Sequence, residues 1–324
     1  ENMRTVLSTN AQKSKYYCKT KYSLVQRIHV IRTVKELREY RDSLNAPTES
    51  IGFVPTMGAL HAGHISLMRS ACARNKIMIA SIFVNPKQFS LGEDFDKYPR
   101  QLELDLDILS KQNFGSKFSC LFAPTEAEMY PSRPLCHIEP TDFSHIYEGT
   151  KRPDFFRGVA TVVGKLLNIV RPTDVYFGQK DISQCILVRR MVSDLNMPVN
   201  VNVIETIREE SGLAMSSRNA YLNEKERNAA VILFQALSEG KALFSNSKDI
   251  PCEVIRLKIE AILKKEPLVT QIEYISIANP MDMTELEVCK AGAVISAAIR
   301  VGNVRLIDNV LVGSAESIIS CIDL

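Results

Sequence analysis

The stretch Ile51-Gly-Phe-Val-Pro-Thr-Met-Gly-Ala-Leu-His-Ala-Gly-His64 decides the fold of this chain. Its first five residues form an apolar run of strand length. A turn rich in glycine and histidine follows, and then a helix that we expect over about 64–75. A strand, a tight turn and a helix in this order are typical of the opening of a βαβ unit. The stretch therefore predicts one strand of a parallel sheet with a helix packed against it.

Strand-like and helix-like segments continue to alternate beyond this stretch. Residues 77–84 form a continuous apolar run, as expected for a strand that is buried on both faces. Apolar residues recur at helical spacing over 159–170, which predicts a helix with one apolar face. We also expect helices over 102–112 and 182–195, and strands over 120–123, 175–177 and 199–204. The fold class predicted from this alternation is α/β, with a Rossmann-like, doubly wound parallel sheet.

The pattern changes after about residue 205. Helical stretches over 224–239 and 252–265 precede three strand-like runs, over 272–278, 293–299 and 304–310, and Gly302-Asn303 predicts a hairpin between the last two. We expect a Rossmann-like domain over 28–205 and a smaller C-terminal α+β domain over 206–324. Residues 1–27 carry six positive charges against one negative charge. We interpret them as a basic, disordered extension, with an organelle transit segment as the alternative.

Composition excludes several classes of protein. The 324 residues are 45% hydrophobic and 24% charged, which is typical of a soluble globular protein. A net charge of +3 gives no reason to expect a nucleic acid or a membrane as partner. The apolar run over 291–299 is too short to span a bilayer. The eight cysteines contain no C-x-x-C pair, so we expect reduced, mostly buried thiols in a cytoplasmic protein rather than disulfides or a zinc site.

His61 and His64 are the first candidates for chemistry. They follow the first strand and begin a helix, where exposed backbone N–H groups and the helix dipole already favour anions. Two imidazoles at this point predict a phosphate site. The alternative is a histidine pair that only caps the helix. Because strand, glycines and helix occur in sequence, we favour phosphate binding.

Three further loops carry polar residues to the same predicted edge of the sheet. Asn85 and Gln88 follow the second buried strand, and Lys180 and Asp181 follow Gly178 at the end of another. The segment 215–219, Met-Ser-Ser-Arg-Asn, supplies two hydroxyls and a guanidinium that suit oxyanions. Each loop has a structural alternative: capping, a solvated first helical turn or a polar connection. Ligands of a doubly wound sheet bind at this edge, so we expect the three loops to meet there.

Two common nucleotide motifs are missing. The segment from Gly158 to Leu166 resembles a Walker loop but has one residue too many, and Leu166 stands where a hydroxyl must bind Mg²⁺. No G-x-G-x-x-G follows a predicted strand, so a nicotinamide or flavin enzyme is not supported.

Several long motifs resemble the pantoate–β-alanine ligase family of the nucleotidyltransferase superfamily. They are the stretch over 54–64, the segments 81–89 and 98–100, Arg157-Gly-Val-Ala-Thr-Val-Val163, Gly178-x-Lys-Asp181, Met215-Ser-Ser-Arg-Asn219 and Arg305-Leu-Ile-Asp-Asn309. The resemblance runs from about residue 28 to the end of the chain. It implies an ATP-dependent ligase that forms pantoyl adenylate and pyrophosphate, and then pantothenate and AMP.

The resemblance also implies roles for individual residues. Catalysis is implied for seven residues: His61, His64, Asn85, Lys180, Ser216, Ser217 and Arg218. ATP contacts are implied for eleven: Pro55, Met57, His61, His64, Gly178, Lys180, Asp181, Ile207, Met215, Ser217 and Arg218. Pantoate contacts are implied for Met57, Gln88 and Gln184, and magnesium binding for Asp105. Mg²⁺ is the implied cofactor, ATP, pantoate and β-alanine are the implied small-molecule partners, and a homodimer is the implied assembly.

The chain departs from the family pattern at two positions. Phe155 stands where family members typically carry a histidine. If that histidine helps to bind β-alanine in the family, this chain must bind β-alanine in another way. Leu104 replaces an acidic residue that is sometimes found before Asp105. Two alternative functions follow: a related nucleotidyltransferase with another acceptor, or a catalytically silent binding protein. Gln88 and Gln184 argue against the first alternative, and the intact His61 and His64 argue against the second.

Overall fold

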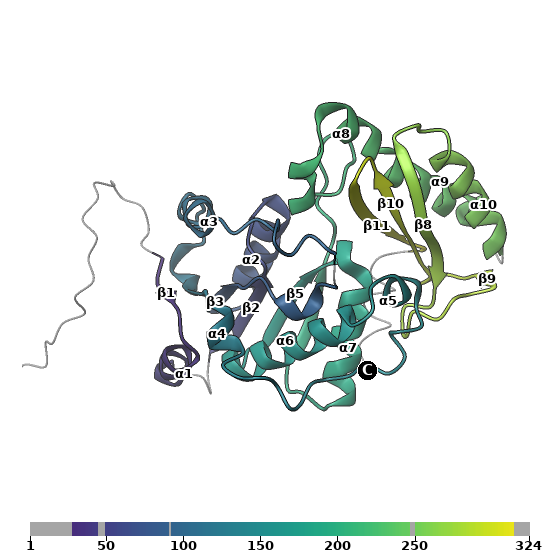
Figure 1. The fold of residues 1–324 in the computed structure, drawn as a ribbon. Helices are drawn as coiled ribbons and strands as arrows, with labels where there is room; N and C mark the ends of the chain where they lie inside the picture. The colour runs from purple at the N-terminus through teal and green to yellow at the C-terminus, as the bar shows by residue number, and fades with distance from the viewer. Residues whose placement is uncertain (1–27, 45–48, 91, 247–249, 314–324) are drawn as a thin grey trace, which may run out of the picture.

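A six-stranded parallel sheet forms the centre of the computed structural model, which describes residues 28–44, 49–90, 92–246 and 250–313. The predicted basic extension over 1–27 lies outside the described residues. The strand order is β1-β4-β3-β2-β5-β6 (Figure 1). The bounds are β1 Val30–Ile31, β2 Ile51–Thr56, β3 Ile77–Ile82, β4 Phe118–Phe122, β5 Asp174–Gly178 and β6 Asn200–Ile204. The predicted α/β fold is confirmed.

Helices cover both faces of this sheet. One face carries α2 (Ala62–Arg74) and α3 (Leu102–Ser110), and the other carries α1 (Val34–Ser43), α6 (Phe155–Val170) and α7 (Ile182–Asp194). Successive side chains of a strand point to opposite faces, so Phe53 packs with α6 and α7 while Val54 packs with α2. The chain moves outward from β2 in one direction to β3 and in the other to β5. This reversal of strand order between β2 and β5 leaves a crevice at the carboxyl ends of the strands, where such sheets bind ligands.

A second, antiparallel sheet has the order β11-β10-β8. Its strands are β8 (Val269–Ala278), β10 (Val294–Val301) and β11 (Val304–Leu311), and helices α9 (Ile232–Asn246) and α10 (Cys252–Leu263) pack against it. The predicted hairpin is confirmed, since Val301 pairs with Val304 and Gly302 takes a φ of +56°. The helix expected over 224–239 is two helices, α8 (Glu224–Ala230) and α9. The division of the chain at residue 205 stays a prediction.

Several short elements have no clear signal in the sequence. They are β1, β7 (Ile250–Pro251), β9 (Val288–Cys289), α4 (Glu126–Met129), α5 (Tyr147–Lys151) and the 3-10 turn η2 (Gly115–Lys117). Helix α5 contacts β8 and lies between the two sheets (Figure 1). The segment that connects β4 to β5 therefore packs, through α5, against the second sheet.

The cysteines are as expected from the sequence, and the helices can be compared with the dimensions of a membrane. The six described cysteines are free, and five of them are buried. Among the helices that the structure describes, none combines the length and apolar character needed to cross a membrane.

Candidate active site

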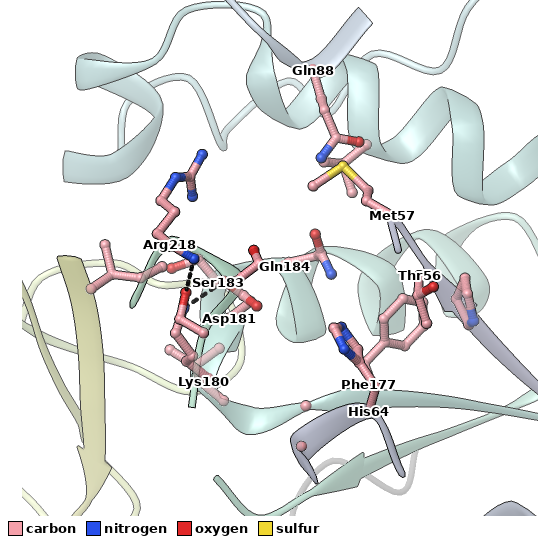
Figure 2. A pocket seen from close by; sticks show the side chains of 18 of the residues that line it. Thr56, Met57, His64, Gln88, Phe177, Lys180, Asp181, Ser183, Gln184 and Arg218 are labelled. Carbon is pink, nitrogen blue, oxygen red and sulfur yellow. Dashed lines mark hydrogen bonds and ion pairs between the residues drawn. The ribbon is translucent and has the colours of Figure 1, made fainter. Parts of the chain in front are cut away.

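A pocket opens at the carboxyl ends of β2, β3 and β5, and residues of β8, β10 and β11 form its opposite wall. Figure 2 shows Lys180 and Arg218 on one side of the opening, with His64 and Gln88 across from them. Fifteen of the sixteen predicted site residues line this pocket: Pro55, Met57, His61, His64, Asn85, Gln88, Gly178, Lys180, Asp181, Gln184, Ile207, Met215, Ser216, Ser217 and Arg218. The tertiary structure thus brings together loops that are up to 163 residues apart in the chain, from Pro55 to Arg218.

His61 and His64 form a reciprocal cap at the start of α2. Nδ1 of His61 accepts a hydrogen bond from the backbone N–H of Gly63 at 3.1 Å, and Nδ1 of His64 accepts one from the backbone N–H of His61 at 3.3 Å. A ring nitrogen that accepts an N–H carries no proton, so each neutral ring carries its proton on Nε2. The pair therefore caps the helix through Nδ1 and keeps an N–H donor on Nε2. Capping and phosphate binding are compatible in this geometry.

Both imidazoles are neutral at pH 7. Burial, reinforced by the nearby charge of Lys180, lowers the pKa of His61 to about 4, although Asp181 opposes the shift. Burial, together with His61 and Lys180, holds the pKa of His64 well below its ordinary value. The two rings can therefore offer N–H groups to an anion without carrying charge. Cationic charge in this part of the pocket comes from Lys180 and Arg218.

Lys180 enters the pocket on the 3-10 turn η3 (Gln179–Asp181), directly after β5. Its Nζ lies 3.7 Å from the carboxylate of Asp181. The side-chain amide of Asn309, on β11, donates to the carbonyls of Gln179 and Lys180 at 2.8 and 3.0 Å. The second sheet therefore fixes the backbone that carries the pocket lysine.

Arg218 lies at the start of the 3-10 turn η4 (Ser217–Tyr221). Its Nε and Nη2 bind the carboxylate of Asp94 at 2.9 and 3.0 Å. Burial would lower the pKa of Arg218, but the hydrogen bonds and charge of Asp94 outweigh burial and raise it. The guanidinium is therefore charged and held from one side. Among the described residues, Nη1 has no hydrogen-bond partner, so it is available to a ligand.

The loop before η4 is held on both sides. Ser216 caps the turn with its hydroxyl, and Ser217 Oγ lies 3.1 Å from the hydroxyl of Tyr98. The backbone N–H of Met215 donates to the carbonyl of Ile207 at 2.9 Å. Ile207 and Met215, two of the implied ATP contacts, thus come from adjacent segments of the pocket wall.

Asn85 lines the pocket, but its amide is fully engaged by neighbours. Oδ1 accepts from the hydroxyl of Tyr130 at 2.9 Å and from the backbone N–H of Lys87 at 3.4 Å. Nδ2 donates to Gln88 Oε1 at 3.1 Å and to the carbonyl of Gly158 at 3.2 Å. Every donor and acceptor of the amide is used within the protein, so Asn85 has no free polar atom for the direct catalytic contact that the resemblance implies.

Asp105, the predicted magnesium ligand, lies outside the pocket lining. It is 1% exposed, and its Oδ1 and Oδ2 accept backbone N–H groups of Leu60 at 2.7 Å and Ala59 at 3.1 Å. Ala59 takes a φ of +51°, so the carboxylate stabilises a strained turn between β2 and α2. In this structure Asp105 holds the turn, and its implied role as a magnesium ligand stays a prediction. Within the described ranges, no three His, Cys, Asp or Glu side chains are grouped to hold a metal ion.

Sequence reasoning missed a buried network of ion pairs in the pocket wall. Arg305, on β11, binds both oxygens of Glu148 at 3.1 and 2.7 Å, and its Nε binds Glu273 at 2.7 Å. Burial would lower the pKa of Arg305, but the two carboxylates raise it. The Arg305 motif is part of the family resemblance, yet no spacing in the sequence connects it with Glu148. Only the packing of α5 against the second sheet makes the pair.

Phe155, the unusual residue of the sequence, lies in the pocket wall under Arg152. The guanidinium carbon of Arg152 is 3.8 Å from the centre of the Phe155 ring, and the same guanidinium binds Glu93 at 2.7 and 2.8 Å. A cation over an aromatic face is a favourable contact. This part of the wall is therefore an ordered, charged surface with an aromatic floor.

Comparison with known proteins gives a consistent answer. The family model described as pantoate-beta-alanine ligase matches residues 29–311. The pantothenate synthetase of Thermodesulfovibrio yellowstonii is 45% identical over 285 residues, which are 88% of this chain and all of that protein. The pantothenate synthetase of Herpetosiphon aurantiacus is 44% identical over 88% of this chain and all of its own length.

Solved structures agree in fold and in sequence. The crystal structure of pantothenate synthetase from Thermus thermophilus superposes with a TM-score of 0.81 at 40% identity, covering 89% of this chain and all of that chain. A pantoate-beta-alanine ligase from Francisella tularensis, complexed with β-γ ATP and β-alanine, gives a TM-score of 0.71 at 36% identity, covering 88% of this chain and 98% of that chain. The motifs, the fold and these relatives together show that the chain belongs to the pantoate–β-alanine ligase family.

Proposed function

We propose that this ligase activates pantoate as an acyl adenylate before it joins the acid to β-alanine. A carboxylate oxygen of pantoate attacks the α-phosphorus of ATP, and the bond from that phosphorus to the oxygen bridging to the β-phosphate breaks, releasing pyrophosphate. The amine of β-alanine then attacks the pantoyl carbonyl. The bond from this carbon to AMP breaks, the nitrogen loses a proton, and pantothenate and AMP leave.

The observation that carries this proposal is the cluster of phosphate-binding groups in one pocket. The Nε2–H groups of His61 and His64, the ammonium of Lys180 and the free Nη1 of Arg218 belong to residues that line the same cavity. Phosphoryl transfer depends on positioning and on stabilising the charge that develops, and needs no protein nucleophile. Neutral N–H donors beside two cations supply this stabilisation in a buried setting.

The remaining lining residues suit the three substrates. The segments of Ile207 and Met215 would frame the adenine, with Gly178 and Asp181 at the ribose. Ser216 and Ser217 would donate to phosphate oxygens. Pantoate would lie between Gln88 and Gln184, against Met57, with Pro55 at the edge of the nucleotide. The structure of the Francisella tularensis relative with β-γ ATP and β-alanine supports ATP and β-alanine as substrates of this chain as well.

Magnesium would reach this site with ATP. Mg²⁺ usually keeps several waters and binds mainly through the phosphates of the substrate, so it does not require a cage of protein side chains. Asp105 already accepts two backbone N–H groups, and no step of the proposal depends on it as a magnesium ligand. The homodimer and the cytoplasmic location stay predictions, which light scattering and localisation in cells can test.

Exchange of labelled pyrophosphate into ATP tests the adenylate. We expect exchange that requires pantoate and occurs without β-alanine, and we expect pantothenate and AMP once β-alanine is added. Exchange that starts only with another acid would favour the related nucleotidyltransferase. Pantothenate formation without any pantoate-dependent exchange would refute a separate adenylation step, and a chain without either activity would be a silent binding protein.

A further inference from the structure

Tyr130, which directly follows α4, does not line the pocket, but it hydrogen-bonds to a residue that does. Its hydroxyl donates to Oδ1 of Asn85 at 2.9 Å, and Asn85 in turn donates to Gln88 at 3.1 Å. The motifs that pointed to the family do not include this tyrosine, and the reaction proposed above gives it no role. We infer that Tyr130 is a positioning residue for pantoate, because it holds Asn85 so that Gln88 presents N–H donors to the acid. This inference rests on the proposed contact of Gln88 with pantoate.

Backbone groups fix the orientation of the two amides. The N–H of Lys87 can only donate, so the Asn85 atom 3.4 Å away is Oδ1; the carbonyl of Gly158 can only accept, so the Asn85 atom 3.2 Å away is Nδ2. Nδ2 then donates its second hydrogen to Gln88, which must receive it on Oε1. Among the described residues, Nε2 of Gln88 has no partner. Gln88 therefore faces the pocket with two donors, which suit a carboxylate or hydroxyl oxygen of pantoate.

Tyr130 is the stronger of the two donors that hold Asn85 Oδ1. Its bond measures 2.9 Å, whereas the bond from the Lys87 N–H measures 3.4 Å. Asn85 is 1% exposed, so bulk water has little access to its Oδ1 when the contact is lost. Without the hydroxyl, Oδ1 of Asn85 would keep one weak partner. The amide could then rotate, and the donors of Gln88 would no longer be fixed toward the acid.

The surroundings of Tyr130 hold its ring in place. The ring centre lies 6.2 Å from that of Phe83 at the end of β3, and the ammonium groups of Lys165 and Lys87 lie 5.2 and 5.8 Å from it. Lys165 belongs to α6 and Lys87 to the 3-10 turn η1 (Pro86–Gln88). Burial, with a smaller effect of Glu126, raises the pKa of Tyr130 to about 12. The hydroxyl therefore remains a proton donor throughout the neutral pH range.

Tyr130→Phe removes the hydroxyl and keeps the ring. We expect the KM for pantoate to rise about five- to tenfold, in keeping with the loss of one buried hydrogen bond, and the KM for ATP and for β-alanine to stay within about twofold. Tyr40→Phe is the matched control, because Tyr40 hydrogen-bonds Ser119 outside the pocket lining. An unchanged KM for pantoate, or an equal rise for all three substrates, would overturn the inference.

The same change in a Gln88→Ala background tests whether Tyr130 acts through Gln88. We expect Tyr130→Phe to add nothing to the effect of Gln88→Ala, whereas additive effects would contradict the inference. If Tyr130→Phe does not fold, Asn85→Asp replaces the Nδ2 donor by an oxygen, and an unchanged KM for pantoate in that variant would also overturn it.

The two proposals fail in different ways. A wild-type enzyme that does not use pantoate contradicts the proposed function. A wild-type enzyme that uses pantoate, with a raised KM in Gln88→Ala and a normal KM in Tyr130→Phe, contradicts only the role of Tyr130.

Discussion

Replacing His61 with Asn separates the structural role of this histidine from its chemical role. Nδ1 of His61 accepts the Gly63 N–H at 3.1 Å, while Nε2 carries the proton that we propose is donated to phosphate. The Oδ1 of an asparagine lies at about the same distance from the backbone as Nδ1, and asparagine is a strong N-cap residue. His61→Asn should therefore keep the cap and lose the donor. His61→Ala should lose both.

The expected magnitudes differ enough to be measured. Loss of an N-cap to alanine costs about 1 kcal/mol, so His61→Ala should lower the free energy of unfolding by about that amount and His61→Asn by less than about 0.5 kcal/mol. Loss of one preorganised donor to a developing charge slows a reaction by roughly 10²- to 10³-fold. Both variants should therefore show that loss in pantoate-dependent pyrophosphate exchange, since neither retains the Nε2–H.

Urea unfolding and the exchange rate, measured on the same preparations, decide the outcome. His29→Asn is a suitable control, because His29 packs on Tyr40 outside the pocket lining and its replacement should leave exchange unchanged. Near-normal exchange in His61→Asn would refute the phosphate role of Nε2. A loss of stability in His61→Asn as large as that in His61→Ala would refute the cap.

Three other perturbations test the geometry of the pocket. The pKa of His61 is about 4 in the folded chain and about 6.5 in the unfolded chain, so the unfolded chain binds more protons as the pH falls below about 6.5. Stability that is present at pH 7.5 is therefore lost at lower pH, and the share of this loss due to His61 is ~2 kcal/mol at pH 5. Urea unfolding at pH 7.5 and pH 5 should show a smaller loss of stability in His61→Asn than in the wild type. Arg218→Lys keeps the charge but cannot bind Asp94 through two atoms while facing a phosphate, so kcat/KM for ATP should fall about tenfold or more; an unchanged value would show that charge alone suffices. Gly158→Ala would place a methyl group 2.1 Å from the Lys87 carbonyl and force η1 away from α6, so we expect a loss of roughly 1–3 kcal/mol in unfolding and a raised KM for pantoate, whereas a variant with wild-type stability would contradict the close packing.

Much of the fold could be predicted because its determinants are local. The apolar run over 77–84 predicts a strand buried on both faces, and β3 is such a strand. The helical spacing over 159–170 predicts α6, which the structure extends to begin at Phe155. By contrast, β1 is two residues long and exists only because Val30 and Ile31 pair with β4. A pairing of this kind leaves no periodic pattern in the sequence.

For the candidate site, too, some features could be predicted from the sequence and others could not. The residue types at strand ends, together with the family motifs, predicted fifteen of the pocket residues, because parallel strands bring their carboxyl ends to one edge. The state of each group could not be predicted. Whether Asp105 faces a metal or two backbone N–H groups, and whether Asn85 is free or fully bonded, depends on atoms within about 3 Å that come from distant parts of the chain.

The sequence by itself determined the layered sheet, the edge at which ligands bind and the chemical groups delivered to that edge, since periodicity, turn residues and strand order are encoded locally. Only the tertiary structure decided which nitrogen of each histidine keeps its proton, which side of Arg218 is occupied and which amide of the Asn85–Gln88 pair faces the pocket with free donors. Hydrogen bonds and desolvation act over a few ångströms in three dimensions, so they are settled by neighbours that the linear order does not reveal.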